Sequence, residues 1–443
     1  MKVFLSATSL APRYGGPAYS VSRLALALAG AGVKVGLWSA DGSVMDTPLL
    51  AADAPLTRLG GTAEDALEQF RPDIVHDNGL WLGHNHRLAR ACKMMVLPRL
   101  VSTRGMLEPW ARRHKKWKKD IAWLAYQGRD IRAAAALHAT AEQEAENLAR
   151  LNLDVPVHVI PNGVDIPALV SLPLSGSVRT ALFLGRIYPV KGLPLLIEAW
   201  SRVRPEGWRL VLAGPDEAGH RAELEALTAK HGLGDIIQFT GPLLDAAKDS
   251  ALFGADLFVL PTHSESFGMA IAEALAHGVP VLTTVGAPWP ALERQAMGWR
   301  TPISVEGLAA GLAQATKSDS SVLRAMGERG RAFVMGGAIA VHLTAHRLLG
   351  KRGKPLLAEI FHLPTRSDVD AKLLVGSAIF GVGWGLGGFC PGPALVSAAA
   401  GQRDALLFVV AMTIGMLLQH ATTRPAVSSA RPSDAPSANP SST

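Results

Sequence analysis

Cysteine is almost absent from this chain of 443 residues, which contains only Cys92 and Cys390. Two cysteines so far apart in the sequence exclude a cysteine-based zinc site and argue against a structural disulfide. Tyrosine is also scarce, with four residues, and no segment combines basic and aromatic residues in the manner of an RNA-binding motif. We therefore expect no nucleic-acid partner.

Charged residues make up only 18% of the chain, and the mean hydropathy of +0.19 is high for a wholly soluble enzyme. The net charge is nevertheless +7, which suits an anionic membrane surface or an anionic substrate. The apolar run within Met1–Thr8 is too short for a signal peptide. We expect this segment to be the first strand of a sheet, and the N-terminal part of the chain to stay in the cytoplasm.

Short apolar runs alternate with helical segments over the first three quarters of the chain. Strand-like runs include 3–7 and 33–38 in the first half, and 180–187 and 256–260 in the second. A helix is predicted over 17–29, with proline near its first position and glycine after its last. This alternation indicates parallel sheets with helices on both faces. The predicted fold class is α/β, with two doubly wound, Rossmann-like domains facing a cleft.

Two glutamates, Glu265 and Glu273, bracket a short turn and the start of a predicted helix. The strand-like run 255–262 places Glu265 at the carboxyl end of a strand, where open α/β sheets bind ligands. Glu273, two turns into the helix, can reach vicinal hydroxyls such as those of a ribose. Amides near the helix N-terminus favour a phosphate, and they belong to Phe267, Gly268 and Met269. The segment suits a sugar nucleotide, although two solvated glutamates on an amphipathic helix would give the same pattern.

Two further turns between strand and helix carry residues that suit a diphosphate. Arg186 and Lys191 flank one such turn, and they supply the cations that a diphosphate leaving group needs. Gly15 and Gly16 follow the first strand and would let the backbone approach the same diphosphate from the opposite domain. A pair of surface cations and a simple tight turn are the alternative interpretations.

Together these motifs resemble family 4 of the retaining glycosyltransferases, whose signature is two glutamates separated by seven residues. The resemblance runs from Met1 to about Arg331 and includes a hinge-like segment, 159–165. It implies the glycosyltransferase B fold and a nucleotide-sugar donor, without a cofactor or metal. It further implies that Glu265 contacts the transferred sugar, Glu273 the nucleotide ribose, and Arg186 and Lys191 the diphosphate. In such enzymes the leaving phosphate itself accepts the proton of the incoming hydroxyl.

Two other residues lie near the expected site. Many family members carry histidine where this chain has Arg104, directly after the strand-like run 97–103. Arg104 could contact sugar or phosphate but is not a base. His76 follows another strand, and a single histidine of this kind is more often structural than catalytic.

The segment 110–126 reads as a basic amphipathic helix. Trp110, Trp117, Ile121 and Leu124 share one helical face, and six cations crowd the other sides: Arg112, Arg113, Lys115, Lys116, Lys118 and Lys119. We expect a packed helix with a solvated basic face, and a helix lying on an anionic bilayer is the close alternative.

The sequence pattern changes after about Arg331. A short apolar helix is predicted over 333–349, and a second apolar run over 405–418. The uncharged run 373–400 exceeds the about 20 residues that span a bilayer, so it is a transmembrane candidate. The Ser/Pro/Ala-rich residues 421–443 should be disordered.

Residues from about 334 to 418, with the run Cys390-Pro-Gly-Pro393, resemble the C-terminal part of YeeE/YedE-type membrane proteins of sulfur-compound transport. We therefore expect an acceptor-side domain at 1–162, a donor-nucleotide domain at 163–332, and a fused hydrophobic helical segment at 333–420. The pair Asp368 and Asp370 matches an Asp-x-Asp metal motif, but its place beside the transmembrane candidate favours a polar loop, and we expect no metal.

Three functions remain open from the sequence. The first is a retaining transfer of sugar from a UDP- or GDP-linked donor to a polysaccharide or lipid-linked glycan, at the cytoplasmic face of the inner membrane. The second is membrane transport of a sulfur compound by the C-terminal segment. The third is a glycosyltransferase-fold protein inactivated by the fusion.

Overall fold

The structure is a computed structural model that describes residues 1–113, 115–167, 178–217, 219–350 and 403–422. The predicted transmembrane run 373–400, the Asp368–Asp370 pair and Cys390 lie outside the described residues, as does the predicted tail after Thr422. The chain divides into two units, of which the first includes all strands named below. The second includes helix α17 (Arg403–Thr422), which is considered by itself.

The first lobe is built on a seven-stranded sheet in the order β3-β2-β1-β4-β5-β6-β7. All its neighbouring strands pair in parallel. Its strands are β1 (Lys2–Ala7), β2 (Lys34–Ser39), β3 (Thr57–Leu59), β4 (Ile74–Asn78), β5 (Arg99–Ser102), β6 (Ala136–Ala139) and β7 (Val157–Val159). The direction of strand succession reverses between β1 and β4, which makes this the point where such sheets bind ligands.

The second lobe repeats this arrangement with a six-stranded parallel sheet in the order β10-β9-β8-β11-β12-β13. Its strands are β8 (Arg179–Leu184), β9 (Trp208–Ala213), β10 (Ile237–Gly241), β11 (Leu257–Leu260), β12 (Val281–Thr284) and β13 (Gly298–Thr301). The reversal lies between β8 and β11. The prediction of two doubly wound, Rossmann-like lobes is confirmed.

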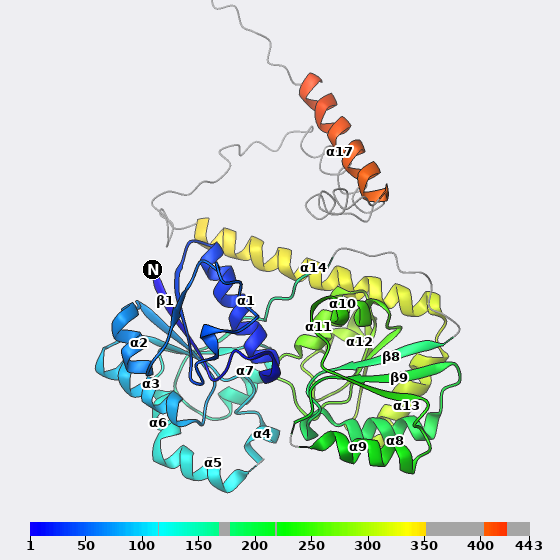
Figure 1. Ribbon diagram of the computed structural model, residues 1–443, viewed down its shortest axis with the longest axis horizontal. Coiled ribbons are helices and arrows are strands. Elements are labelled where there is room, and N and C mark those ends of the chain that lie inside the picture. The colour runs from blue at the N-terminus through cyan, green and yellow to red at the C-terminus, as the bar shows by residue number, and fades with distance from the viewer. Residues whose placement is uncertain (114, 168–177, 218, 351–402, 423–443) are drawn as a thin grey trace, which may run out of the picture. The chain divides into compact units, whose positions relative to one another are not determined.

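Helices connect successive strands in both lobes (Figure 1). In the first lobe they are α1 (Gly16–Gly30), α2 (Ala63–Phe70), α3 (Gly83–Met94), α4 (Pro109–Arg113), α5 (Lys116–Ala122), α6 (Gly128–Arg132) and α7 (Glu142–Ala149), with short turns η1 (Pro12–Tyr14), η2 (Ser43–Met45) and η3 (Trp123–Gln127). In the second they are α8 (Leu193–Val203), α9 (His220–Lys230), α10 (Asp245–Phe253), α11 (Met269–Ala276), α12 (Ala291–Arg294) and α13 (Val305–Lys317), with η4 (Pro189–Lys191).

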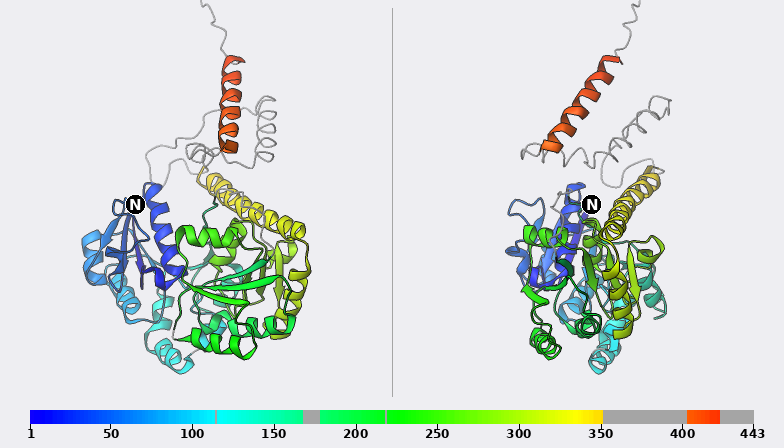
Figure 2. Two further views of the ribbon diagram at one scale, coloured as in Figure 1. Left: turned by 45° about the vertical axis from the view of Figure 1, so that its right-hand side comes forward. Right: turned by 90° about the vertical axis from the view of Figure 1, so that its right-hand side faces the viewer.

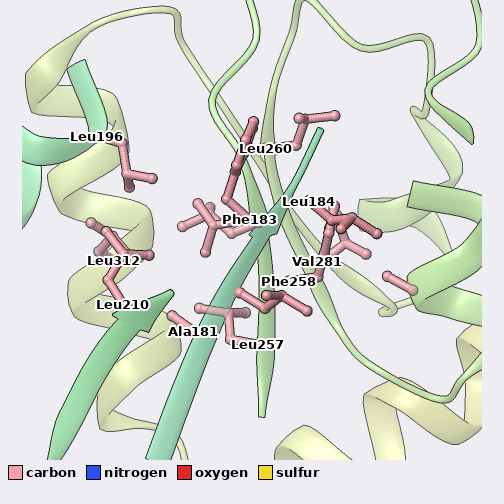
Figure 3. Packing of buried hydrophobic residues seen from close by; sticks show 14 of the residues in the cluster. Ala181, Phe183, Leu184, Leu196, Leu210, Leu257, Phe258, Leu260, Val281 and Leu312 are labelled. Atoms are coloured by element: carbon pink, nitrogen blue, oxygen red, sulfur yellow. The ribbon is translucent and has the colours of Figure 1, made fainter. Parts of the chain in front are cut away.

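Each sheet is covered on both faces, and this explains the near-continuous apolar strands. In β1, Leu5 belongs to one buried cluster and its neighbour Phe4 to another, because successive side chains point to opposite faces. In the second lobe, Phe183, Phe258 and Leu260 of the central strands lie in one buried cluster with residues of α8 and α13 (Figure 3). The rigid centre of each sheet thereby fixes the loops that leave β1, β8 and β11.

A single helix, α14, spans Ser320–Gly350. The helix predicted at 333–349 is therefore the C-terminal part of a longer helix, and the predicted join near Phe333 falls inside it. The first half of α14 packs against the end of α11 (Figures 1 and 2). Arg331 donates to the carbonyl oxygens of Ala276 and Pro167, both at 2.6 Å. Among the residues that the structure describes, no helix is long and apolar enough to cross a membrane.

The prediction of one continuous, packed helix over 110–126 is wrong. Lys115 has a left-handed backbone with φ of 53°, which separates α4 from α5, and the π-helical turn η3 follows. Trp110 stacks on His263 with ring centroids 6.5 Å apart. It is thereby separated from Trp117, Ile121 and Leu124, whose side chains are exposed.

Candidate functional site

The candidate site is formed by three loops, and each follows a central strand at a point where strand order reverses. The loop after β1 carries Gly15 and Gly16, the loop after β8 carries Arg186 and Lys191, and the loop after β11 carries Glu265. Because the carboxyl ends of parallel strands lie at one edge of a sheet, the loops after β8 and β11 bring Arg186, Lys191 and Glu265 to the same edge although these residues are distant in sequence.

Gly15 of the first lobe lies against Arg186 of the second. It caps the N-terminus of α1 with φ of 79°, a conformation that side chains disfavour. A Cβ atom here would lie 3.2 Å from Arg186 Cδ, whereas one at Gly16 would have no heavy atom within 4 Å. The Arg186 guanidinium donates to Glu217 Oε2. The glycine turn of the first lobe thus lies beside a cation of the second lobe, and its approach to a diphosphate stays a prediction.

Lys191 and Glu265 form an ion pair in the second lobe. Lys191 ends the turn η4, and its Nζ donates to Glu265 Oε1 at 2.5 Å. Both side chains are largely buried, with 16% and 12% of their surface exposed. The Glu265 amide donates to the carbonyl oxygen of Gly286 at 2.9 Å, which fixes the loop. A cation and a carboxylate are therefore held together beside the reversal point of the sheet.

Glu273 is the fifth of the eight residues of α11 and contacts cations from both lobes. Lys248 of α10 donates to its Oε1 at 3.0 Å. Arg23 NH1 of α1 lies 3.9 Å from the same oxygen, and that nitrogen is buried without a hydrogen-bond partner among the described residues. Arg23 NH2 pairs with Asp165 Oδ2 at 2.9 Å. The carboxylate expected to meet a ribose is thus surrounded by positive charge.

The backbone before α11 is shaped by its anchoring residues. Gly268 caps the helix with φ of 83°, and the first amides of a helix have no acceptor within it. The predicted phosphate-binding amides of Phe267, Gly268 and Met269 lie at this end of α11. The Phe267 side chain is buried against Trp289, whose Nε1 donates to the Phe267 carbonyl oxygen at 2.5 Å. Phe267 contributes its backbone to the site and its ring to the core.

Arg104 lies in the first lobe beside the Glu265 loop and the hinge-like segment. Its NH2 and NH1 groups donate to Asn78 Oδ1 at 2.6 Å and to Asn162 Oδ1 at 3.1 Å. Burial lowers the Arg104 pKa to about 10, so the guanidinium stays charged at neutral pH. A Cβ atom at the next residue, Gly105, would lie 3.0 Å from Ser266 Cβ. The loop that carries Arg104 in the first lobe therefore lies directly against Ser266 of the second lobe.

Glu144 holds the Arg104 loop in place and was not predicted. One of its carboxylate oxygens accepts from Thr103 Oγ1 at 2.6 Å and from the Gly105 amide at 2.8 Å. The other accepts from the Thr140 amide and hydroxyl, both at 2.8 Å. The same Thr140 hydroxyl oxygen lies 3.1 Å from the Ser266 carbonyl oxygen of the second lobe, so its one proton is shared between the two acceptors.

His76 belongs to a buried polar chain beneath the site. Its Nε2 lies 2.7 Å from Ser102 Oγ, which lies 2.6 Å from His138 Nδ1. Burial, with a smaller contribution from the Arg104 charge, lowers the His76 pKa to about 3. The imidazole is therefore neutral throughout the physiological range and links β4, β5 and β6.

Sequence reasoning did not identify Arg23, Lys248 and Glu217 as members of this site. Arg23 lies on α1 beyond its glycine turn, Lys248 on α10 and Glu217 before α9, and each reaches the site only once the helices pack. The hinge-like segment Pro161-Asn-Gly-Val-Asp165 was recognised in the sequence, and it contains the acceptors of two of these contacts. Its Asn162 and Asp165 accept from Arg104 and Arg23.

Comparisons with known proteins agree with this geometry. Residues 15–163 match a family described as "Glycosyl transferase 4-like domain" and residues 170–333 one described as "Glycosyl transferases group 1". A D-inositol 3-phosphate glycosyltransferase from Actinosynnema mirum is 30% identical over 284 residues, covering 57% of this chain and 68% of that protein. The chain belongs to the glycosyl transferases of group 1.

Further relatives of this glycosyl transferase of group 1 differ in coverage. A GDP-mannose:cellobiosyl-diphosphopolyprenol alpha-mannosyltransferase from Xanthomonas campestris is 28% identical over 216 residues, covering 48% of this chain and 56% of that protein. Among solved structures, Anabaena HepE in complex with UDP-glucose has a TM-score of 0.62 at 17% identity, covering 80% of this chain and all of that one. The latter likeness concerns the fold.

The C-terminal part has separate relatives. Residues 322–429 match a family of unknown function (DUF6691). A "probable transporter" from Xylella fastidiosa is 49% identical over 86 residues, covering 19% of this chain. The chain spans 58% of the length of that relative.

Glu108, near the Arg104 loop, should make stability depend on pH. Burial, and secondly the Glu144 charge, raises the Glu108 pKa to about 7 from 4.5. Between these values the folded chain keeps a proton that the unfolded chain has lost, so stability decreases as pH rises and the loss is complete above about pH 7. Glu108→Gln should therefore stabilise the chain by about 2 kcal/mol at pH 8 and by little at pH 4.5.

Urea denaturation of the parent and of Glu108→Gln, each at about pH 8 and about pH 4.5, would measure this difference in stability. Glu146→Gln, an exposed glutamate of α7, is the matched control and should change neither value. An equal effect of Glu108→Gln at both pH values would contradict a titration of this carboxyl group.

Proposed function

We propose that this chain is a retaining glycosyltransferase that moves a sugar from a UDP- or GDP-linked donor. The acceptor in this proposal is a polysaccharide or a lipid-linked glycan at the cytoplasmic face of the inner membrane. Family membership supports sugar transfer. The Xanthomonas relative, named for a GDP-linked donor and a diphosphopolyprenol acceptor, and the UDP-glucose complex of HepE support the two donor classes.

The observation that carries the proposal is the pairing of opposite charges where strand order reverses. Lys191 pairs with Glu265 at 2.5 Å, and Lys248 with Glu273 at 3.0 Å. Burial of ions is costly unless they are paired, and three of the four residues, Lys191, Glu265 and Glu273, belong to motifs that the sequence singled out. A donor supplies matching partners, since its diphosphate can take the cations while its hydroxyl groups take the carboxylates.

The residues then have distinct roles in the proposed reaction. Arg186 and Lys191 neutralise the diphosphate as the glycosidic bond breaks, and the Gly15 turn brings backbone close to it. Glu265 holds the transferred sugar and Glu273 the ribose, while the amides before α11 contact phosphate. The leaving phosphate oxygen takes the proton of the acceptor hydroxyl that attacks from the same face.

Donor binding is the first test. Glu273→Ala should weaken nucleotide binding roughly 10- to 100-fold, because hydrogen bonds to a charged group contribute about 1.5–3 kcal/mol. Thermal-shift titration of the detergent-solubilised chain with UDP, GDP and their sugars would measure the loss. Glu206→Ala, an exposed glutamate before β9, should bind as the parent does.

Equal shifts for the parent and Glu273→Ala would overturn the assignment of Glu273. If no nucleotide shifts the melting temperature of the parent, the inactive glycosyltransferase-fold protein becomes the better description.

The C-terminal segment carries a second candidate function. Its 49% identity to a probable transporter over 86 residues favours a transport role for that segment alone, and we propose a sulfur compound as the cargo. This function requires Cys390, so Cys390→Ser should abolish any thiosulfate uptake that the chain confers on a deficient strain. Uptake that survives the substitution would argue against it.

A further inference from the structure

A stripe of three large apolar side chains lies exposed on the first lobe. Trp117, Ile121 and Leu124 expose 65%, 60% and 86% of their surface, and we refer to them as the apolar stripe. They stand four and three positions apart on α5 and η3, so they follow one face of the helical segment. In all views this segment lies at the lower end of the first lobe (Figures 1 and 2).

Two cation–aromatic contacts hold the segment that carries the apolar stripe. Lys119 Nζ lies 5.7 Å from the centre of the Trp81 ring and donates to the Ala111 carbonyl oxygen. The Arg112 guanidinium lies 5.2 Å from the centre of the Trp123 ring. These contacts anchor the segment to the lobe, so its exposed face is held in a fixed position although it contributes little to the core.

Exposed cations flank the stripe. Arg113, Lys115, Lys116 and Lys118 are all exposed, and the Lys118 ammonium lies 5.3 Å from the centre of the Trp117 ring. Asp120 is the one carboxylate within the helix α5 itself, and it pairs with Lys116 at 2.5 Å. The charge around the stripe is therefore strongly positive.

A shallow hollow of about 300 Å³ adjoins the segment. Its lining includes four cations, Arg112, Arg113, Lys116 and Arg150, and one carboxylate, Asp120. Arg150 also donates to Asn147 Oδ1 at 3.4 Å. The hollow thus offers a concentration of guanidinium groups, which bind phosphate oxygens in a bidentate manner.

We propose that the apolar stripe, its flanking cations and this hollow form a docking surface for an anionic lipid bilayer. The three apolar side chains enter the boundary between headgroups and acyl chains, and the cations contact lipid phosphates. Charge favours this occupant over the apolar helix α17 of the same chain, since the charges of Arg403 and Asp404 in that helix cancel and leave no net negative charge to match the cations. The docking rests on the proposed function for its role, because a lipid-linked acceptor lies in the same bilayer.

Site-specific labelling can separate this docking from membrane attachment by the C-terminal segment. An environment-sensitive fluorophore is placed on Leu124→Cys or, as control, on Met94→Cys, an exposed position at the end of α3 in the same lobe. Both are made in the full chain with Cys390→Ser. Burial raises the Cys92 pKa to about 12, so that thiol does not compete for the label.

Vesicles of phosphatidylcholine with and without one-third phosphatidylglycerol are then added. We expect a several-fold rise in emission at position 124 with the anionic vesicles, little change with neutral ones, and no change at position 94. The double variant Lys115→Glu, Lys118→Glu should lower the affinity for the anionic vesicles at least fivefold for each lysine replaced. Nucleotide thermal shifts should stay as in the parent, so failure of docking and failure of the donor site are distinguishable.

Three results would overturn the proposal. Equal emission changes at positions 124 and 94 would mean that another part of the chain brings the lobe to the membrane. An emission already high without vesicles would mean that the stripe is covered by α17 or a second copy. Absence of vesicle binding would exclude the bilayer as partner.

Discussion

Replacing Lys191 with alanine is expected to lower nucleotide release from the sugar donor by roughly 100- to 1000-fold. The reason is that charge develops on the diphosphate as the glycosidic bond breaks, and Lys191 is one of two cations at the loop after β8. Donor binding should fall less than the rate, since the interaction strengthens in the transition state. The assay uses the nucleotide sugar that raises the melting temperature of the parent. The rate is measured as the nucleotide released from that donor.

The variant also leaves Glu265 buried without its partner, which is 2.5 Å away in the parent. A loss of stability of a few kcal/mol is therefore expected as well, and it has to be separated from the loss of rate. The double variant Lys191→Met with Glu265→Gln removes both charges and should recover most of the stability, while the rate stays low. Lys230→Ala, at the end of α9, is the surface control.

A rate within threefold of the parent in Lys191→Ala would contradict the role of Lys191 at the diphosphate. Recovery of the rate in the double variant would mean that the loss in Lys191→Ala came from the unpaired Glu265 carboxylate, and it would contradict the proposed roles of both residues.

The second large effect is expected at Gly327, on the face of α14 that packs against α11. A Cβ atom here would overlap the carbonyl oxygen of Gly278, and its nearest neighbours are backbone atoms that cannot rotate away. Gly327→Ala should cost about 3 kcal/mol of stability, at the upper end of overpacking effects, which lowers the melting temperature by roughly 6 to 12 °C. Thermal denaturation followed by circular dichroism would measure it.

Gly336→Ala is the matched control on the same helix. A Cβ atom at Gly336 would have no heavy atom within 4 Å, so alanine should stabilise the helix by up to about 1 kcal/mol. Because α11 carries Glu273, Gly327→Ala should also weaken nucleotide binding, whereas Gly336→Ala should not. Equal melting temperatures for the two variants would show that α14 does not pack as described.

The architecture followed from the sequence because buried parallel strands are continuous apolar runs separated by helices. The runs that became β1, β4, β8 and β11 were recognised in this way. Strands β3 and β7 were missed because each has three residues, too few for any periodicity. The break between α4 and α5 was missed because helical periodicity continues through it, whereas the left-handed Lys115 carries no sequence signal.

The residues of the candidate site likewise fall into those that the sequence predicted and those that it did not. Arg186, Lys191, Glu265 and Glu273 were predicted because each follows a strand within a recognisable motif. Arg23 and Lys248 were not, because they project from α1 and α10 and their meeting at Glu273 depends on how these helices pack. Glu144 was missed for a different reason, since its function is to accept hydrogen bonds from backbone and hydroxyl groups of two loops.

The continuity of α14 constrains how its two halves can vary. The matches to the glycosyl transferases of group 1 and to the family of unknown function overlap over residues 322–333, and the helix continues beyond them without interruption. Each residue advances a helix by 1.5 Å and about 100°. A one-residue insertion after Gly330 would thus rotate everything beyond it by that angle, while Gly327 stayed seated on α11. The faces of the two halves are therefore fixed relative to each other, and an insertion has to come close to a whole number of turns, as seven residues do, to preserve that relation.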